Sequence, residues 1–362
     1  MFDNQYYDNH ERVIQVSDDA SGLKAIIAIH STARGPAMGG CRLWSYDSPA
    51  AAFDDALRLS QGMSFKNALA DLPAGGGKAV ILGPLPKDRR TSFFETFGKI
   101  IESLNGEYIT AEDVGVTEAD MVTVSRSTKY VSGIAAQGGV GGNPSPFTAR
   151  GVRIGLEAAV LSALKRRDLE GLRVAVQGLG GVGSNLCREL SERGAKLIVA
   201  DLNEKRVEEA CDTYSAERAS IDDILLADVD ILAPCALGGI ITNEVAAKMR
   251  ARIVAGGANN QLSGLDAGLA LFQRGITYAP DYVINAGGII VVTAEYLNQF
   301  DVTEVERAIS RISERTSQVL KRSALQGQPA NVVADQMAKE VISKAARERS
   351  EKGASGRIAV HA

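Results

Sequence analysis

The stretch RVAVQGLGGVGSNLCREL, residues 173–190, decides the fold of this 362-residue chain. A strand pattern over 173–177 runs directly into the turn Gly178-Leu179-Gly180-Gly181-Val182-Gly183, and a helical pattern follows over 182–194. A GxGxxG turn between a strand and a helix is typical of dinucleotide binding. Its glycines let the backbone approach a pyrophosphate, which the helix N-terminus attracts. The alternative is a tight turn in an α/β protein that binds no dinucleotide.

A carboxylate closes the next expected strand, KLIVA over 196–200. Asp201 follows Gly178 by about 20 residues, where it can accept hydrogen bonds from both ribose hydroxyls. It would repel the 2′-phosphate of NADP, and no arginine follows it directly. We therefore expect NAD as the cofactor, with Leu202 beside it.

Strand and helix patterns alternate with short connections over residues 149–329. The strands are expected over 173–177, 196–200, 229–233, 252–256 and 276–284. Such alternation forces parallel pairing through right-handed crossovers. The fold class is therefore α/β, with a Rossmann-type doubly wound sheet in this domain.

The sequence pattern of residues 1–136 predicts a separate α/β domain, which we expect to bind the substrate. The Gly- and Pro-rich segment 137–148 is expected to be a hinge beside a cleft between the domains. Strands are expected over 24–30, 79–82 and 107–110, and helices over 50–70, 92–105 and 117–125. Gly75-Gly76-Gly77 are expected to form a loop before the strand 79–82. A C-terminal helix, about 330–362, could pack back on this domain.

Composition and charge argue against several classes of protein. Hydrophobic residues make up 45% of the chain, which is enough for a substantial core. The net charge is −4 and there is no basic run, so we expect no nucleic-acid partner. It has no apolar run of about 18 residues and no signal-like N-terminus, so we expect a cytoplasmic protein with no membrane partner. The chain has four cysteines but no CxxC pair, and two of its three histidines, His10 and His361, lie near the termini. We therefore expect no metal site and no histidine-based catalytic triad.

Two lysines and an aspartate form a second candidate site in residues 1–136. Lys66 lies in GMSFKNALADLP, Lys78 follows Gly75-Gly76-Gly77, and Asp113 lies in TAEDVG. Apolar neighbours and a second ammonium favour the neutral form of a lysine, which can then act as a base. The alternative is a plain glycine turn with a solvated Lys78, and a surface helix that carries Lys66.

Several motifs resemble the glutamate/leucine/phenylalanine/valine dehydrogenase family, in matching order over about residues 24–325. They are GPAMGG (35–40), GMSFKNALADLPAGGGKAVI (62–81), TAEDVG (110–115), GNPSPFTARGV (142–152), VAVQGLGGVG (174–183), APCALGG (233–239), GGANNQL (256–262) and YAPDYVINAGG (278–288). The resemblance implies reversible, NAD-dependent oxidative deamination of an L-amino acid to its 2-oxo acid and ammonium. A homo-oligomer that binds these small molecules is expected.

The resemblance also implies roles for individual residues. Lys66 would pair with the substrate α-carboxylate, assisted by Asn260, while Lys78 would act as the base and Asp113 would shuttle protons. Gly39 and Gly40 permit close backbone approach to the substrate ammonium. The remaining cofactor contacts would come from Thr148, Cys235, Ala236, Ala258 and Asn259, although Thr148 is equally typical of a helix N-terminus.

The side-chain pocket is expected to be apolar. Members that act on glutamate are similar here but place a lysine before the paired glycines, where this chain has Met38. Met38, Ala111 and Val292 favour leucine and other branched-chain substrates, whereas Phe147, Met38 and Ile289 could equally line an aromatic pocket. A phenylalanine or tryptophan dehydrogenase is the close alternative. A catalytically inactive dinucleotide sensor would have no reason to keep both lysines and the aspartate, and a 2-hydroxy-acid dehydrogenase would need a well-placed histidine.

Overall fold

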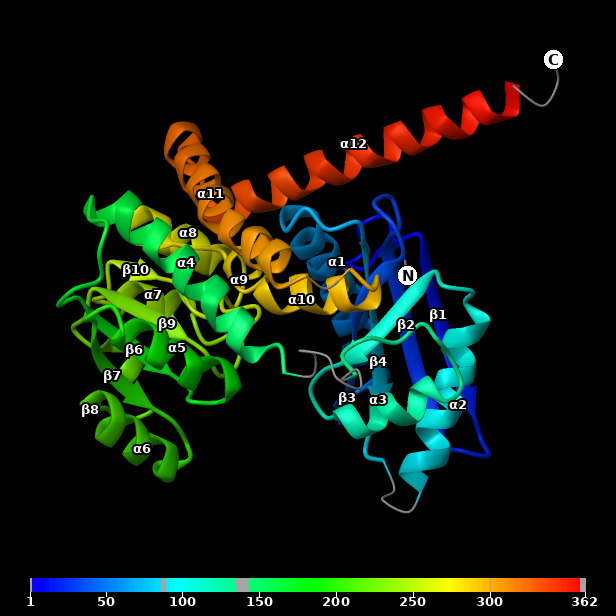
Figure 1. Cartoon of the computed structure of the whole chain (residues 1–362), viewed down its shortest axis with the longest axis horizontal. Coiled ribbons are helices and arrows are strands. Elements are labelled where there is room, and N and C mark those ends of the chain that lie inside the picture. Colours follow the sequence, from blue (N-terminus) through cyan, green and yellow to red (C-terminus); the bar gives the residue numbers. More distant parts are fainter. Residues whose placement is uncertain (1, 86–88, 135–142, 300, 359–362) are drawn as a thin grey trace. The chain divides into compact units, whose positions relative to one another are not determined.

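The computed structural model describes residues 2–85, 89–134, 143–299 and 301–358. The chain divides into two compact units, each with its own sheet (Figure 1). Unit 1 comprises Met1–Gly142, Val292–Phe300 and Ala338–Ala362, and unit 2 comprises Asn143–Val291 and Asp301–Met337. The predicted α/β fold class is confirmed. The first half of the expected hinge, residues 137–142, lies outside the described residues.

Unit 2 contains a six-stranded parallel sheet in the order β11-β10-β9-β6-β7-β8. The strands are β6 (Arg173–Gln177), β7 (Lys196–Ala200), β8 (Glu217–Arg218), β9 (Ile231–Pro234), β10 (Ile253–Val254) and β11 (Thr277–Tyr278). The first strand of the unit, β6, lies in the middle, so the strand order reverses beside it. Ligands of such sheets bind at the carboxyl ends of the strands, at this reversal. The predicted doubly wound sheet is therefore confirmed.

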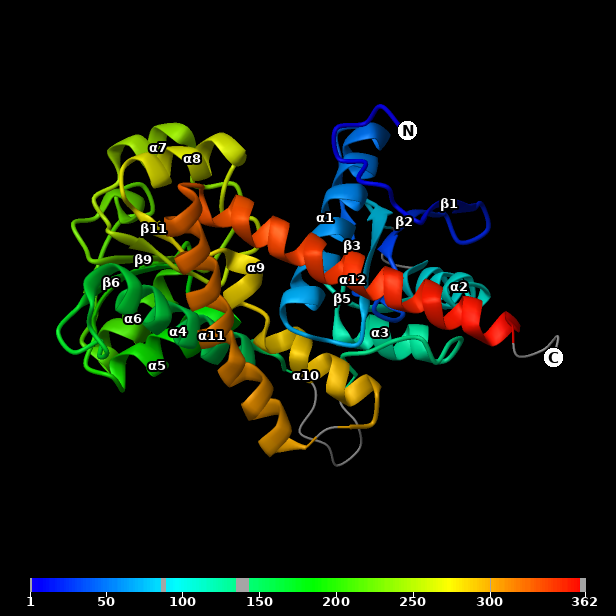
Figure 2. The same ribbon diagram turned by 90° about the horizontal axis from the view of Figure 1, so that it is seen from above.

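Helices cover both faces of this sheet. Figure 2 shows α4, α5 and α6 on one side of the sheet, with α7 and α8 on the other. The helices of unit 2 are α4 (Ser145–Leu164), α5 (Gly181–Ser191), α6 (Glu204–Tyr214), the 3₁₀ turn η2 (Ile224–Leu226), α7 (Asn243–Lys248), α8 (Leu265–Gln273), α9 (Asp281–Ile284) and α11 (Val302–Gln326). A hydrophobic core in this unit packs Ile224, Met249 and Leu271 against the apolar residues of the sheet.

Two expected strands of this sheet are shorter than the sequence indicates. Only Ile253–Val254 of the expected strand 252–256 are paired, and only Thr277–Tyr278 of 276–284. Residues 281–284 instead form the helix α9, so that part of the strand prediction is wrong. Pro280 precedes α9, and a proline fixes φ and cannot donate to a strand ladder, so pairing stops there.

Unit 1 contains a mixed five-stranded sheet in the order β1-β2-β4-β3-β5. The strands are β1 (Arg12–Asp18), β2 (Leu23–Ser31), β3 (Ala37–Trp44), β4 (Gly75–Leu82) and β5 (Tyr108–Glu112). Pairing is antiparallel from β1 through β2 to β4 and parallel from β4 through β3 to β5. The sequence analysis did not identify β1, because its alternation is half polar and it lies at an edge.

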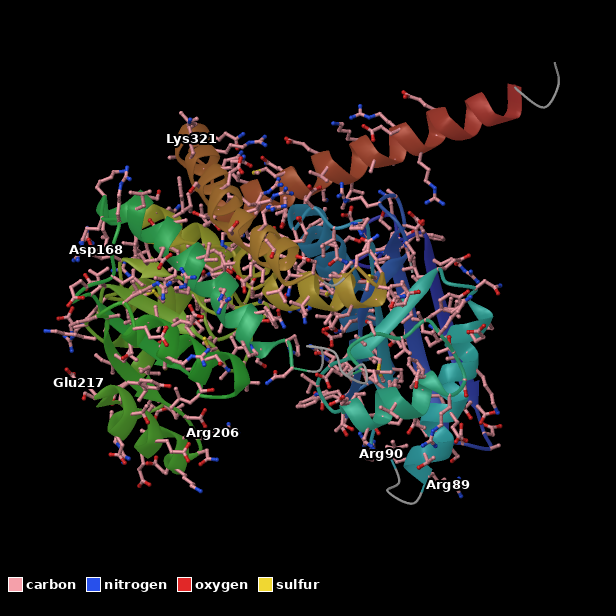
Figure 3. All side chains as sticks on the ribbon, in the orientation of Figure 1. Arg89, Arg90, Asp168, Arg206, Glu217 and Lys321 are labelled. Carbon is pink, nitrogen blue, oxygen red and sulfur yellow. The ribbon has the colours of Figure 1, made fainter. Side chains whose placement is uncertain are left out.

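The two faces of this sheet pack against different helices. Helix α1 (Pro49–Leu69) begins at Ser48, whose side chain accepts the Ala51 N–H, and covers the face that carries Val80. Helices α2 (Arg90–Ser103) and α3 (Glu118–Ser125) contribute to the core on the face that carries Ala79. Arg90, labelled in Figure 3, ties these two helices together through paired hydrogen bonds of 2.6–2.7 Å to Asp120.

The expected glycine loop before the strand 79–82 is wrong, because Gly75, Gly76 and Gly77 belong to β4 itself. A Cβ atom at Gly75 would lie 1.9 Å from the Ser31 carbonyl oxygen, and one at Gly76 would lie 2.0 Å from the Ser64 nitrogen. At Gly77 it would meet the Tyr108 ring at 2.8 Å. Side chains are therefore excluded here by close packing on three sides, rather than by the conformational needs of a turn.

Two further helices complete the chain: α10 (Gly287–Tyr296) and α12 (Ala330–Ile358). From Ala338 onward α12 belongs to unit 1, where Lys339 Nζ lies 2.9 Å from Asp8 Oδ2 and Arg349 donates to the Thr32 carbonyl at 2.8 Å. Among the described residues, none of the helices combines the length and apolar character needed to cross a bilayer.

A buried histidine pair lies beneath this attachment of α12 and predicts a response to acid. His30 Nδ1 shares a hydrogen bond of 2.8 Å with Ser64 Oγ, and its Nε2 lies 3.7 Å from Asp8 Oδ2. The His30 ring packs edge-on against the ring of His10. Burial, and next the neighbouring His10, lower the pKa of His30 to about 4. An unfolded histidine titrates near 6.5, so the stability that neutral His30 contributes is complete above about pH 6.5 and is lost as the pH falls towards 4.

We therefore expect unit 1 to lose about 2 kcal/mol of stability between pH 7.5 and pH 5 through His30 alone. Urea unfolding followed at both pH values measures this loss. His30→Gln keeps a hydrogen-bonding group near Ser64 but cannot titrate, so its loss between the two pH values should be smaller. Equal losses in the variant and the wild type would contradict the assignment.

Candidate active site

A buried ion pair lies at the centre of the candidate site in unit 1. Lys78 Nζ, on β4, lies 2.5 Å from Asp113 Oδ2, just beyond the end of β5, and the Lys78 side chain is only 7% exposed. Burial alone would raise the pKa of Asp113, but the charges of Lys78 and Arg42 outweigh it and lower that pKa well below its usual range. The alternative of a solvated Lys78 in a plain turn is therefore wrong.

Arg42 is the second cation on this carboxylate, and the sequence analysis missed it. Its Nε lies 3.2 Å from Asp113 Oδ2, while its Nη1 lies 3.0 Å from Asp55 Oδ2. Asp55 also accepts from Tyr46 and Arg58, both at 2.6 Å. The negative charge of Asp113 is thus shared between two cations, Lys78 and Arg42. Asp113 therefore compensates the positive charge of Lys78 only in part. The available signal was one arginine inside the otherwise apolar strand AMGGCRLW.

Lys66 lies in the last turn of α1, which packs over the glycines of β4. The neighbouring Asn67 is fully buried, and its Nδ2 donates to the Gly75 carbonyl at 2.6 Å. Ser64 lies against Gly76 from the same helix. These contacts fix the end of the helix that carries Lys66, which is itself half-buried. Asn67 is a second residue that the sequence analysis missed.

Gly39 and Gly40 lie in the middle of β3, where no side chain fits. A Cβ atom at Gly39 would lie 1.9 Å from the Gly77 carbonyl oxygen, and one at Gly40 would lie 2.6 Å from that of Glu112. Backbone therefore forms this part of the site.

Apolar side chains flank the two glycines. Met38 is 2% exposed, and its Sδ lies 3.8 Å from Thr293 Oγ1 on α10. Val292 precedes Thr293 on α10 and is buried, and Ala111 pairs with Gly40 across the β3–β5 ladder. Met38 and Ala111 thus lie beside Gly39 and Gly40. Met38 also contacts the segment of α10 that carries Val292. Ile289, half-buried, lies in the part of α10 that belongs to unit 2.

The glycine turn of unit 2 has the geometry of a pyrophosphate cradle. Gly178 has a φ of +94°, and a Cβ atom there would lie 2.6 Å from Ala236 Cβ. Gly183 approaches the Gly178 carbonyl so closely that a Cβ atom would lie 1.9 Å from its oxygen. Among the residues that the structure describes, apart from its chain neighbours, none comes within 4 Å of a Cβ atom built at Gly180, and α5 begins at Gly181, followed by Val182. The turn leaves its open side at the N-terminus of α5, where an anionic group fits.

Asp201 lies beside this turn. Its Oδ2 accepts the Leu179 N–H at 2.5 Å, and its Oδ1 accepts the Asn203 N–H at 2.8 Å. The carboxylate is therefore held at the carboxyl end of β7, next to the fingerprint glycines, and the adjacent Leu202 is exposed. A ribose that followed a pyrophosphate on the turn would meet this carboxylate.

The remaining predicted cofactor residues lie in two loops and at the start of α4. The Cys235 N–H donates to the Gln177 carbonyl at 2.7 Å, and the Ala258 N–H donates to the Pro234 carbonyl at 2.9 Å. Asn285, which the sequence analysis missed, donates to the side chain of Asn259 at 2.9 Å. Asn260 is exposed and has a φ of +52°.

Thr148 lies in the first turn of α4. Its hydroxyl donates to the Pro144 carbonyl at 3.0 Å, within the helix start. A Cβ atom at Gly288, at the start of α10, would lie 2.5 Å from this hydroxyl. Thr148 therefore contributes to the close packing between the start of α4 and the start of α10.

Comparisons with known proteins agree with this geometry. Residues 10–130 match the model of the Glu/Leu/Phe/Val dehydrogenase dimerisation domain, and residues 138–203 and 199–350 match that of glutamate/leucine/phenylalanine/valine dehydrogenase. A leucine dehydrogenase of Bacillus subtilis is 47% identical over 95% of this chain and 94% of its own length. A phenylalanine dehydrogenase of Bacillus thermotolerans is 39% identical over 92% of this chain and 88% of its own.

A solved structure extends the likeness to the fold. The crystal structure of L-tryptophan dehydrogenase from Nostoc punctiforme aligns with a TM-score of 0.81 and 40% identity, over 93% of this chain and 97% of that chain. The family resemblance inferred from the motifs is thus confirmed over nearly the whole chain. The chain belongs to the glutamate/leucine/phenylalanine/valine dehydrogenase family and is an amino acid dehydrogenase, an oxidoreductase.

Proposed function

We propose that this chain catalyses the reversible, NAD-dependent oxidative deamination of an apolar L-amino acid to its 2-oxo acid and ammonium, with leucine and other branched-chain substrates favoured. The observation that carries the proposal is the buried Lys78–Asp113 pair beside Gly39, Gly40 and Met38. It combines a proton-transfer pair with an apolar wall. The leucine dehydrogenase relative supports the choice of leucine.

The residues of unit 1 divide the proton transfers between them. Lys66 holds the substrate α-carboxylate, and Lys78 accepts a proton so that the substrate nitrogen is a neutral amine. NAD, when bound, would supply the acceptor for the hydride of Cα. Lys78 passes the proton of the amine to Asp113 across their 2.5 Å contact, so it is neutral again when it takes a proton from the water that attacks the resulting iminium carbon. Asp113 then returns its proton to the nitrogen of the carbinolamine, ammonia departs and takes up the hydroxyl proton to give ammonium, and Lys78 releases its own proton to solvent.

Residues of unit 2 fit the cofactor. The open side of Gly180 and the start of α5 would take the pyrophosphate, and Asp201 would take the ribose hydroxyls. Cys235, Ala236, Ala258, Asn259 and Thr148 would surround the nicotinamide end, with Asn260 near the substrate carboxylate.

Cofactor choice is expected to depend on Asp201. NAD should support a higher kcat/KM than NADP, because a carboxylate repels the 2′-phosphate. Asp201→Asn keeps an acceptor for the Leu179 N–H while it removes the charge, so it should reduce this preference by about 10-fold or more. Arg206, exposed on the outer face of α6 (Figure 3), provides the matched change, since Arg206→Gln should leave the ratio unaltered. A wild type that used both cofactors equally well would contradict the role of Asp201.

A homo-oligomer is also proposed. It is supported by the match of residues 10–130 to a dimerisation domain. Light scattering after gel filtration measures the mass, and a single-chain mass would overturn this part of the proposal.

One assay tests the proposed activity and its alternative. NADH formation is followed with each L-amino acid at alkaline pH, and kcat/KM is compared for leucine, valine, phenylalanine, tryptophan and glutamate. A preference for an aromatic substrate would favour a phenylalanine or tryptophan dehydrogenase, as the relatives with those names suggest. No turnover with any amino acid would favour a dinucleotide-binding sensor.

A further inference from the structure

The parallel ladder between β3 and β4 is interrupted at the residues that form the candidate site. Among the described residues, Met38 pairs with Gly76 and Cys41 pairs with Ala79, but residues 39–40 form no ladder pair with residues 77–78. The register is the same on both sides of this gap, so no bulge has inserted a residue. The two strands therefore lack paired ladder contacts where they carry Gly39, Gly40 and Lys78, although their backbones approach closely at Gly39 and Gly77.

The side chain of Tyr108 bridges this gap. Its hydroxyl donates to the Gly39 carbonyl at 2.7 Å, with the Gly40 carbonyl at 3.2 Å, and accepts the Ala79 N–H at 3.1 Å. One phenol thus binds backbone groups of both strands. Burial raises the pKa of the Tyr108 phenol, so the hydroxyl remains a donor throughout the working pH range.

Tyr108 acts from the face of the sheet opposite to the lysine side chain. Its ring belongs to the core that includes Ala79 and Ile81 and lies beside Gly77, where a Cβ atom would come within 2.8 Å of it. Lys78 has the opposite orientation along β4, the same as Val80, which packs against α1. Tyr108 can therefore influence the reaction only through the backbone that it holds.

We propose that Tyr108 is a positioning residue, whose hydroxyl takes the place of the missing ladder contacts and fixes the backbone of Gly39, Gly40 and Lys78 for catalysis. The inference rests on the proposed role of Lys78. Without the hydroxyl, the Gly39 carbonyl and the Ala79 N–H lose their shared partner inside the core, and the strands move to satisfy these groups. A displacement of about 1 Å at a reacting group can cost about 100-fold in rate.

The test compares Tyr108→Phe with Tyr130→Phe. Phenylalanine keeps the ring of Tyr108 and removes only its contacts with the two strands. Tyr130 packs at the edge of the same core. Within the part of the chain that the structure describes, its hydroxyl forms no hydrogen bond with β3 or β4, so Tyr130 is the matched control. Tyr108→Phe should lower kcat by about 10- to 100-fold and leave the KM for NAD and the Kd for NADH within about twofold. Tyr130→Phe should retain wild-type kcat.

A pH profile and a melting curve separate positioning from general stability. Because Tyr108 does not titrate in the working range, the midpoints of the kcat profile should remain those of the wild type. The loss of kcat should also persist well below the melting temperature of the variant. Wild-type kcat in folded Tyr108→Phe, or an equal loss of kcat in Tyr130→Phe, would overturn the inference.

Gly77→Ala provides a second variant for the case in which Tyr108→Phe does not fold. Its methyl group would push against the Tyr108 ring without removing the hydroxyl, so kcat should again fall with little change in NADH binding. Wild-type kcat in this variant would overturn the inference. Lys78→Ala, assayed in parallel, separates the two proposals. If it keeps turnover, both fall; if it loses turnover while Tyr108→Phe keeps it, only the positioning role falls.

Discussion

Lys78→Ala should lose nearly all turnover, with kcat reduced by about 100- to 10,000-fold, the range typical of a lost general base. The side chain that would accept protons from the substrate nitrogen and from water is then absent. The variant should still fold, because Arg42 remains to pair with Asp113 at 3.2 Å. NADH binding, measured by fluorescence, should be unchanged, since the residues proposed to bind the dinucleotide lie in unit 2.

The matched control is Lys99→Ala, which removes an exposed lysine of α2 in the same unit. It should match the wild type in kcat and in NADH binding. If Lys78→Ala kept more than about a tenth of the wild-type kcat, another group would have to be the base.

Substrate selection should show the second large effect. We expect kcat/KM for L-leucine to exceed that for L-glutamate by at least about 100-fold, because a carboxylate buried without a cation costs several kcal/mol. Met38 is buried beside Gly39, and a thioether cannot compensate that charge. Met38→Lys should therefore reduce the ratio of leucine to glutamate activity.

Met38→Leu is the control for this effect, since it keeps an apolar side chain of similar size. It should retain the wild-type ratio. A wild type that preferred glutamate would overturn the pocket argument, while the family assignment would stand on the motifs and the alignments.

Local sequence patterns predicted those features of the fold that depend on local periodicity and turn chemistry. Strand β6, the glycine turn and α5 follow one another in the sequence, so their arrangement could be predicted directly. The carboxylate of Asp201 could be placed because a parallel neighbouring strand must end beside the turn. Lys78 and Asp113 were expected in one site mainly from the family resemblance, and their 2.5 Å contact was not predictable from spacing.

The missed features depend on contacts between distant segments. Tyr108 bonds the carbonyl of Gly39 across the sheet, and Arg42 meets Asp113 far along the chain. A lone tyrosine or arginine in an apolar strand carries no local sign of its partner. The error over 75–77 has the same cause, since the sequence cannot reveal that Ser31, Ser64 and Tyr108 surround these glycines.

The backbone wall formed by residues 39–40 and 75–77 limits how this enzyme can diversify. Because atoms at these positions would lie within 3 Å of neighbouring backbone or of a buried ring, random mutagenesis should recover almost no active substitutions there. New substrate ranges would then arise at the flanking side chains, such as Ala111 and Val292, where a side chain is already accommodated. A directed-evolution library is accordingly best concentrated on those flanking positions, with the five glycines left intact.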